Sequence, residues 1–303
     1  MRDVIPAALA DERVDRVVAM VAGVSRREAA ELIAAGAVRL DGGAVTAGST
    51  RVREGADIVI DVERLAPEPP LLADASVPVV VVYADDDVIV VDKPEGVVVH
   101  PGSGRSSPTL VHGLLARFPE LADVGEAARP GIVHRLDKGT SGLMVVARTQ
   151  HAYSSLVAQL AERTAGRVYL ALVWGAPSSV VGVVDAPIGR STRDRTRMAV
   201  RPEGKAARTR YEVLRTFHRP VPTALVECHL ETGRTHQIRV HLAAIGHPVL
   251  GDAQYRGDRG AINVARPMLH AARLAITHPT TGERLEFTSA LPPDMQSLID
   301  SLE

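Results

Sequence analysis

The sequence predicts an α+β protein that is divided into two domains. Its 303 residues suffice for one large or two ordinary domains. Four prolines give residues 63–78 the composition of a semi-rigid linker. Beyond it, strand-like runs of Val and Ile alternate irregularly with helical patterns, without a βαβ period or a glycine-rich phosphate loop, which favours a mixed sheet over a doubly wound nucleotide-binding fold. We therefore predict domains at residues 1–62 and 79–303.

The composition excludes several classes of protein. Hydrophobic residues make up 46% of the chain and charged residues 23%, as in ordinary globular proteins. Cys228 is the single cysteine, so an intrachain disulfide, a Cys-Cys metal site and a CxxC redox site are excluded. No apolar run reaches the roughly 18 residues that cross a bilayer, and the N-terminus has no signal-peptide core. We expect a cytoplasmic, metal-free protein in a reducing compartment.

The charge is unevenly distributed, although the formal net charge is only -1. Residues 190–273 contain 16 basic and 7 acidic residues, which favours a polyanionic partner for this stretch. Of the 35 basic residues, 32 are arginines. A GC-rich genome explains such a bias, but arginine is also the better ligand for phosphates and base edges.

The first domain is predicted to form a compact helix-helix-strand module. Valines recur at i, i+3, i+4 and i+7 between residues 13 and 22, as on one face of a helix. Ser25 and Glu28 form a capping box at the start of a second helix, which Gly36 ends. Short strands are expected at 38–40 and 57–62, the first followed by a turn at 41–43.

The residues of this module resemble a known RNA-binding domain. The stretch VDRVVAMVAGVSRREAAELIAAGAVRLDGG is similar to the alpha-L (S4-like) domain of a small-subunit ribosomal protein. The resemblance implies that Arg26, Arg27 and Arg39 face RNA. Because residues 1–61 contain 8 basic and 10 acidic residues, we expect only weak or auxiliary RNA binding from a local patch. A generic module without RNA contacts is the alternative.

The second domain should combine strands at 79–83, 88–91, 143–147, 168–174 and 223–230 with helices at 109–118 and 152–163. Two polar clusters interrupt this pattern. Residues 131–142, GIVHRLDKGTSG, are typical of a loop that presents a reactive carboxylate, or of an ordinary hairpin turn. Residues 231–242, ETGRTHQIRVHL, gather cationic groups that suit phosphates or carboxylates, or form a solvated basic helix start. The interleaved Ile238, Val240 and Leu242 favour partial burial of this second cluster.

Four motifs together resemble the RluA family of RNA pseudouridine synthases, and in particular its RluD-like branch. They are VDKPEGVVVHPG, HRLDKGTSGLMVVA, RVYLALVWG and GRTHQIRVHLAAIGHPVLGD, in this order. The resemblance implies a catalytic domain with a mainly antiparallel sheet that isomerises uridine in RNA without cofactor or metal. It also implies ribosomal RNA of the large subunit as the substrate, with transfer RNA as the alternative, and we expect a monomer.

The resemblance further implies the roles of individual residues. Asp137 is the catalytic carboxylate, which either attacks C1′ or removes a ribose proton, and Arg239 pairs with it. Tyr169 stacks on the uracil, and its hydroxyl helps to remove the C5 proton. Arg167 stands where the family often has lysine.

The remaining implied roles concern RNA binding and the pocket wall. The uridine must be flipped out of its stack, and Arg135 fills the vacated space. Arg234 and His236 contact RNA. Lys93 orders the pocket wall, with direct participation in the chemistry as the alternative. Leu269 forms either an apolar floor or plain core packing.

Two other functions, non-catalytic RNA binding and the hydrolysis of glycosidic bonds, would require different sets of site residues. A non-catalytic RNA-binding protein would have no reason to combine Asp137, Tyr169 and Arg239. A hydrolase of glycosidic bonds would require a second carboxylate near Asp137.

Overall fold

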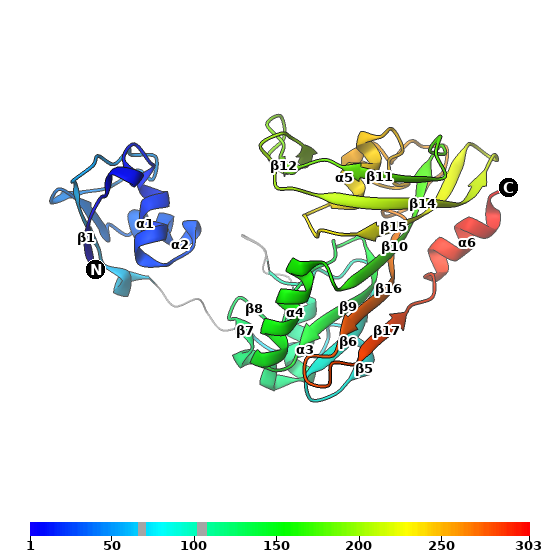
Figure 1. Ribbon diagram of the computed structural model, residues 1–303, viewed down its shortest axis with the longest axis horizontal. Coiled ribbons are helices and arrows are strands. Elements are labelled where there is room, and N and C mark those ends of the chain that lie inside the picture. Colours follow the sequence, from blue (N-terminus) through cyan, green and yellow to red (C-terminus); the bar gives the residue numbers. More distant parts are fainter. Residues whose placement is uncertain (66–70, 102–107) are drawn as a thin grey trace. The chain divides into compact units, whose positions relative to one another are not determined.

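The computed structural model describes residues 1–65, 71–101 and 108–303 and consists of two compact units, Met1–Pro69 and Pro70–Glu303 (Figure 1). The division falls within the predicted linker at 63–78, of which residues 66–70 lie outside the described part of the chain. Leu65 packs against the hydrophobic core of the first unit, whereas Leu71 packs against a core of the second. Each unit therefore has its own core.

The N-terminal unit packs two helices against a small antiparallel sheet. The helices are α1 (Val14–Ala22) and α2 (Arg26–Ala34), and the sheet has the order β1 (Arg2–Val4), β4 (Asp57–Ile60), β2 (Val38–Leu40), β3 (Gly43–Ala44), with short 3-10 turns at Ala7–Leu9 and Val62–Arg64. The predicted capping box is confirmed: Ser25 Oγ accepts from the Glu28 amide at 3.2 Å, and the Glu28 carboxylate accepts from the Ser25 amide at 2.6 Å. The strand predicted at 57–62 is too long, because the chain enters a 3-10 turn at Val62.

The C-terminal unit is built on one nine-stranded sheet. Its strand order is β11 (Val181–Asp185), β14 (Arg208–Phe217), β15 (Thr223–Leu230), β10 (Gly166–Trp174), β16 (Leu269–Thr277), β9 (Ser141–Ala147), β6 (Val88–Lys93), β5 (Val80–Ala84), and β17 (Arg284–Thr288) also pairs with β16. The pairing of β16 with β9 is parallel and the other pairings of this sheet are antiparallel, which confirms the predicted mixed, mainly antiparallel architecture. Two small hairpins, β7 (Gly125–Glu126) with β8 (Arg129–Pro130) and β12 (Ile188–Arg190) with β13 (Met198–Val200), lie outside it.

Helices cover both faces of this sheet. Alternate residues of a strand point to opposite faces, so Tyr169 and Ala171 join a core with α3 (Leu110–Arg117) and α5 (Gln237–Ala244). On the other face, Leu172 and Trp174 pack with α6 (Pro293–Ser301), and strands β6 and β9 pack with α4 (Gln150–Glu162). Within the described residues, no helix is both long and apolar enough to cross a membrane.

The approach of β9 to β16 fixes the loop that precedes β9. Gly142 has a φ of 110°, and a Cβ at this position would overlap the carbonyl oxygen of Ala271, so only glycine allows the pairing. One residue earlier, Ser141 Oγ lies 3.0 Å from His270 Nδ1. The loop at 134–140 is therefore held against β16 by backbone and side-chain contacts.

Candidate active site

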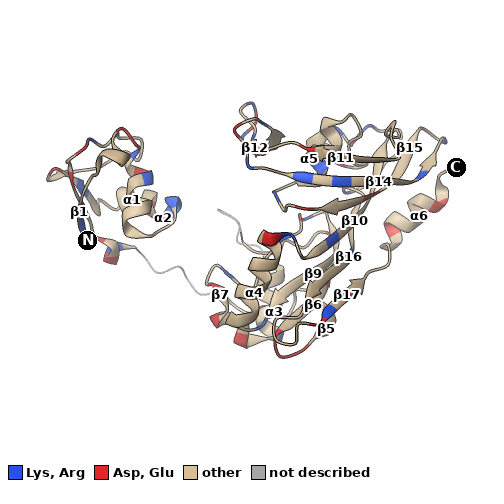
Figure 2. Cartoon of the chain, in the orientation of Figure 1, with Lys and Arg blue, Asp and Glu red and all other residues tan. Residues whose placement is uncertain are grey.

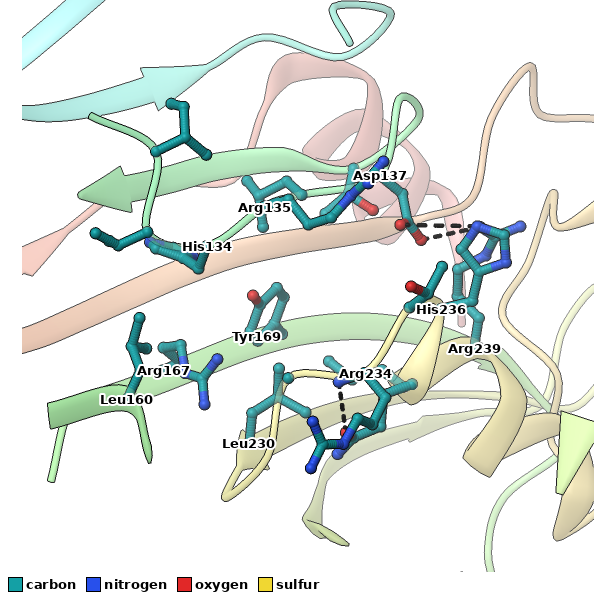
Figure 3. A pocket seen from close by; sticks show the side chains of 18 of the residues that line it. His134, Arg135, Asp137, Leu160, Arg167, Tyr169, Leu230, Arg234, His236 and Arg239 are labelled. Atoms are coloured by element: carbon teal, nitrogen blue, oxygen red, sulfur yellow. Dashed lines mark hydrogen bonds and ion pairs between the residues drawn. The ribbon is translucent and has the colours of Figure 1, made fainter. Parts of the chain in front are cut away.

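A cavity of about 350 Å³ brings the two polar clusters of the sequence together (Figure 3). One wall is the loop that carries Asp137, and the opposite wall is formed by residues 233–239. Tyr169 on β10 and Leu269 at the start of β16 also line it. The two clusters, about 100 residues apart in the chain, thus form a single site.

Asp137 and Arg239 form a hydrogen-bonded ion pair in this cavity. Arg239 Nη1 donates to Asp137 Oδ2 at 2.9 Å. The same guanidinium donates through Nε and Nη2 to both oxygens of Asp252, at 2.6 and 2.8 Å, and through Nη2 to Gln254 Oε1 at 2.8 Å. Burial lowers the pKa of Arg239, but the hydrogen bonds with Asp252 and the charge of Asp137 together raise it above its ordinary value. The guanidinium is therefore a permanent cation with a fixed orientation.

Helix α5 is oriented by hydrogen bonds at its start. Gln237 Oε1 accepts from Thr232 Oγ1 at 2.6 Å and from the Arg234 amide at 3.0 Å, while its Nε2 donates to Thr209 Oγ1 at 2.9 Å. These bonds tie the helix to β14. The first six residues of α5 are all buried, whereas residues 233–235 are exposed, so the cluster at 231–242 is partly buried, as predicted. Specific partners satisfy the polar side chains of the buried part.

Tyr169 and Leu269 form part of the cavity floor and also belong to the core beneath it. They are 6% and 3% exposed. Leu269 therefore lines the cavity and packs in the core at the same time. Burial raises the pKa of Tyr169 to about 12, so its hydroxyl is neutral near pH 7. In Figure 3 its ring lies between Arg167 and the Asp137–Arg239 pair.

Arg167 is a buried cation in this cavity. It is 7% exposed, and its Nε has no hydrogen-bond partner among the described residues. Its guanidinium lies against Gly233, where a Cβ would approach Nη1 to 2.6 Å. Burial lowers the pKa of Arg167, and the group remains available to an anionic or carbonyl oxygen of a ligand.

The positive charge of the cavity comes from arginines rather than histidines. Burial lowers the pKa of His100 to about 4 and that of His134 to about 3, so both rings are neutral at pH 7. Arg135 is exposed, with Nη1 3.5 Å from His100 Nε2, and the exposed Arg234 donates to the Ala206 carbonyl at 3.0 Å. The electrostatic attraction for an anion is thus independent of pH near neutrality.

Of the other predicted site residues, His236 lines the cavity and Lys93 does not. His236 lines the cavity with Nε2 3.8 Å from Asp137 Oδ1. Lys93 lies outside the cavity lining and is fully buried, with Nζ donating to the carbonyls of Pro94 and Val97 at 2.8 and 2.9 Å and to that of Lys138 at 3.5 Å. These bonds connect the loop after β6 to the residue that follows Asp137.

The predicted RNA contacts of the N-terminal unit are exposed, but two of them are already paired. Arg26 lies 3.1 Å from Asp15, and Arg27 lies 2.8 Å from Glu31. Arg39 on β2 is exposed and forms no ion pair within the described part of the chain. Of the three, Arg39 has the most readily available charge.

The sequence analysis assigned no role to three residues that shape the site. Asp252 is fully buried and holds Arg239, Gln254 adds a third contact, and Tyr255 stacks under the Arg239 guanidinium at 5.0 Å. The only sequence signal was the proximity of the pair Gly251-Asp252 to the second cluster. Among the described residues, no three His, Cys, Asp or Glu side chains are grouped so that they could hold a metal ion.

A half-buried carboxylate held by arginine beside an aromatic floor, in a cationic cavity, suits an enzyme that acts on an anionic substrate. Comparison with known proteins specifies the class. Residues 87–244 match the family model described as RNA pseudouridylate synthase, and residues 12–58 match the S4 domain. The chain belongs to the RNA pseudouridine synthases, which are isomerases that act on RNA, and it carries an S4 domain at its N-terminus.

Individual relatives agree with this assignment. The chain is 44% identical to the Uncharacterized RNA pseudouridine synthase YlyB of Bacillus subtilis, over 96% of this chain and 94% of the relative. It is 43% identical to the Ribosomal large subunit pseudouridine synthase D of Xanthomonas campestris, over 99% and 91%. The solved structure of Human RNA Pseudouridylate Synthase Domain Containing 1 matches 78% of this chain and 97% of its own, with 30% identity and a TM-score of 0.56. The family and fold expected from the motifs are thereby confirmed.

Proposed function

We propose that this synthase modifies uridines of large-subunit ribosomal RNA and that Asp137 is its catalytic carboxylate. The observation that carries the proposal is the Asp137–Arg239 pair, which lies in the cavity beside Tyr169. Relatives named Ribosomal large subunit pseudouridine synthase D, 43% and 48% identical, support this substrate. Transfer RNA is the alternative.

The reaction exchanges one bond to the ribose for another. The N1–C1′ bond breaks, the uracil turns in place, C5 bonds to C1′, and the C5 proton is lost while N1 gains one. Asp137 acts either by attacking C1′ or by removing a ribose proton. Both roles require an ionised carboxylate, and the guanidinium of Arg239 donates a hydrogen bond to Asp137 Oδ2 at 2.9 Å.

The target uridine reaches Asp137 only when it is flipped out of the RNA. Flipping costs a few kcal/mol, which contacts in the cavity must offset. Stacking of the uracil on Tyr169 contributes about 1–3 kcal/mol. The exposed guanidinium of Arg135 lines the cavity and takes the place of the flipped base in the RNA stack. Arg234 contacts the RNA backbone.

The arrangement of carboxylates argues against a hydrolase. Asp137 is the one carboxylate among the described residues that line the cavity. Asp252 is fully buried behind Arg239 and bound by it through two hydrogen bonds, so it cannot activate water beside the sugar. A glycosidase would need a second carboxylate facing the substrate.

The two units divide the work. The N-terminal S4 domain adds RNA affinity through Arg39, with smaller contributions from Arg26 and Arg27, and the C-terminal unit performs the chemistry. Separate hydrophobic cores support this division. We also propose that the enzyme acts in the cytoplasm as a monomer, without metal or cofactor.

Mapping of pseudouridines in total RNA from cells with and without this gene tests the substrate. We expect the loss of one or a few pseudouridines from large-subunit ribosomal RNA. They should return when the wild-type chain is expressed, and should not return with Asp137→Asn. Loss confined to transfer RNA would replace the proposed substrate, and rescue by the Asn variant would contradict the role of Asp137.

A further inference from the structure

Tyr255 and His236 form a hydrogen-bonded pair next to the reactive carboxylate. His236 Nδ1 lies 2.8 Å from the Tyr255 hydroxyl oxygen, which also accepts a hydrogen bond from the Met198 amide at 3.0 Å. The opposite ring nitrogen, Nε2, lies 3.8 Å from Asp137 Oδ1. A neutral imidazole carries a single N–H, so its tautomer decides whether Nε2 offers that carboxylate a proton or a lone pair.

The hydrogen-bond partners of Tyr255 favour one of the two tautomers. The hydroxyl has one proton to donate, and His236 Nδ1 is its one acceptor among the described residues. If Nδ1 carried the hydrogen, it would donate to the phenol oxygen and leave the hydroxyl proton of the largely buried Tyr255 without a protein acceptor. An unprotonated Nδ1 instead accepts that proton.

The electrostatics at Asp137 favour the same tautomer independently. Arg239 binds Oδ2, so Oδ1 is the carboxylate oxygen that faces His236. A lone pair on Nε2 would repel this anionic oxygen, whereas an N–H attracts it. Burial lowers the pKa of His236, although the charge of Asp137 raises it, so the neutral ring is the relevant form near pH 7.

We propose that Tyr255 fixes His236 in the tautomer that carries its hydrogen on Nε2, so that His236 presents a neutral N–H donor to Asp137 Oδ1. Tyr255 is a positioning residue, and His236 is the donor. The two oxygens of Asp137 are then held from two sides, by Arg239 at Oδ2 and by His236 at Oδ1. The distance of 3.8 Å is beyond a hydrogen bond, so it must shorten when RNA binds, as catalytic hydrogen bonds often do on substrate binding. This functional part rests on the proposed role of Asp137, whereas the tautomer does not.

The tautomer can be observed directly in the full-length protein. In a two-bond proton–nitrogen correlation spectrum of the labelled chain, each nitrogen of the His236 ring reports whether it carries hydrogen. His236 is assigned by the signals that disappear in His236→Gln. We expect hydrogen on Nε2 in the wild type and a mixture of tautomers in Tyr255→Phe. Tyr83→Phe, which loses the 2.6 Å hydrogen bond to Asp85, is the matched control and should leave the pattern unchanged.

Two spectral results would contradict the proposal. Hydrogen on Nδ1 in the wild type would overturn the tautomer, and an unchanged pattern in a folded Tyr255→Phe would overturn the positioning role of Tyr255. If Tyr255→Phe does not fold, the wild-type spectrum alone decides. Neither result depends on whether Asp137 is catalytic.

Two substitutions of His236 test the donor in catalysis. The amide nitrogen of Gln reaches the place of Nε2, whereas that of the shorter Asn does not. His236 has a φ of 57°, a conformation that Asn tolerates better than Gln, so a purely structural role would rank Asn above Gln. The donor role predicts the reverse order, with kcat of His236→Asn about 10- to 100-fold below that of His236→Gln and similar RNA affinities. Equal kcat values, or a higher value for Asn, would remove the donor role, and Asp137→Asn would separately show whether the proposed chemistry holds.

Discussion

The two units use their arginines in different ways. In the N-terminal unit, Arg16 pairs with Glu12 at 2.7 Å and Arg26 with Asp15 at 3.1 Å, so much of the positive charge is neutralised internally. In the cavity of the C-terminal unit, Arg135, Arg167 and Arg234 have no carboxylate partner among the described residues. Basic residues also lie along β14 of the same unit (Figure 2), but Arg208 and Arg210 there pair with Glu231. The unpaired charge of the three cavity arginines therefore lies in the same cavity as Asp137.

The largest effect is expected from Asp137→Asn. The amide retains the shape of the side chain and can still accept from Arg239, but it cannot act as nucleophile or base. Pseudouridine formation should fall to background, while RNA affinity changes by only a few fold, because the phosphate contacts remain. Residual activity above about a few per cent, measured by single-turnover assay, would be incompatible with this role.

Tyr169→Phe should separate the ring of this residue from its hydroxyl. Stacking persists, so RNA binding should be nearly unchanged, but turnover of ordinary uridine RNA should fall about 100-fold or more, because C5 proton removal is impaired. The hydroxyl is neutral at pH 7 and would act by passing on its own proton. With 5-fluorouridine RNA, which has no C5 proton to lose, Phe and wild type should behave alike. Full activity of Tyr169→Phe on uridine RNA would show that the hydroxyl has no chemical role and that Tyr169 contributes only its aromatic ring to the cavity.

Asp252→Asn should lower kcat about 100-fold with little change in KM. The substitution disrupts the two hydrogen bonds to Asp252 that orient the Arg239 guanidinium toward Asp137. Glu227→Gln is the control: it breaks another arginine–carboxylate pair of the same unit, with Arg273 at 2.7 Å, outside the cavity lining. A melting curve of each variant separates folding from catalysis. Equal losses of kcat in the two variants at equal stability would contradict the orienting role.

The smallest effect is expected in the N-terminal unit. Arg39→Ala should raise KM a few fold, leave kcat unchanged and reduce the salt dependence of RNA binding by about one phosphate contact. Arg135→Ala at the cavity should also lower kcat. If Arg39→Ala and Arg135→Ala change KM and kcat in the same way, the proposed difference between the two units is wrong.

Sequence reasoning found the candidate site residues more readily than the framework that holds them. Asp137 and Arg239 lie in motifs that can be recognised in the sequence, and Thr223–Leu230 was predicted with its observed bounds. Helix α5 was considered only as the alternative of a solvated basic helix start, because its buried Gln237, Arg239 and His241 erase the amphipathic pattern.

Other elements gave weak signals for similar reasons. All three residues of β1 are exposed, so no apolar alternation marks it as a strand. The long β14 carries arginines and a register shift, which obscure its period of two. The role of Asp252 arises only from the fold, which brings the turn after α5 against the Arg239 guanidinium.

The central claim is that the C-terminal unit holds the complete catalytic apparatus and that the N-terminal unit supplies only affinity. Single-turnover rates of residues 70–303 and of the full chain, measured at saturating ribosomal RNA fragment, test it most directly. The account predicts rates within a few fold of each other, with a higher RNA concentration needed to saturate the shorter chain. A shorter chain that is folded and binds RNA to saturation, yet forms no pseudouridine, would contradict it.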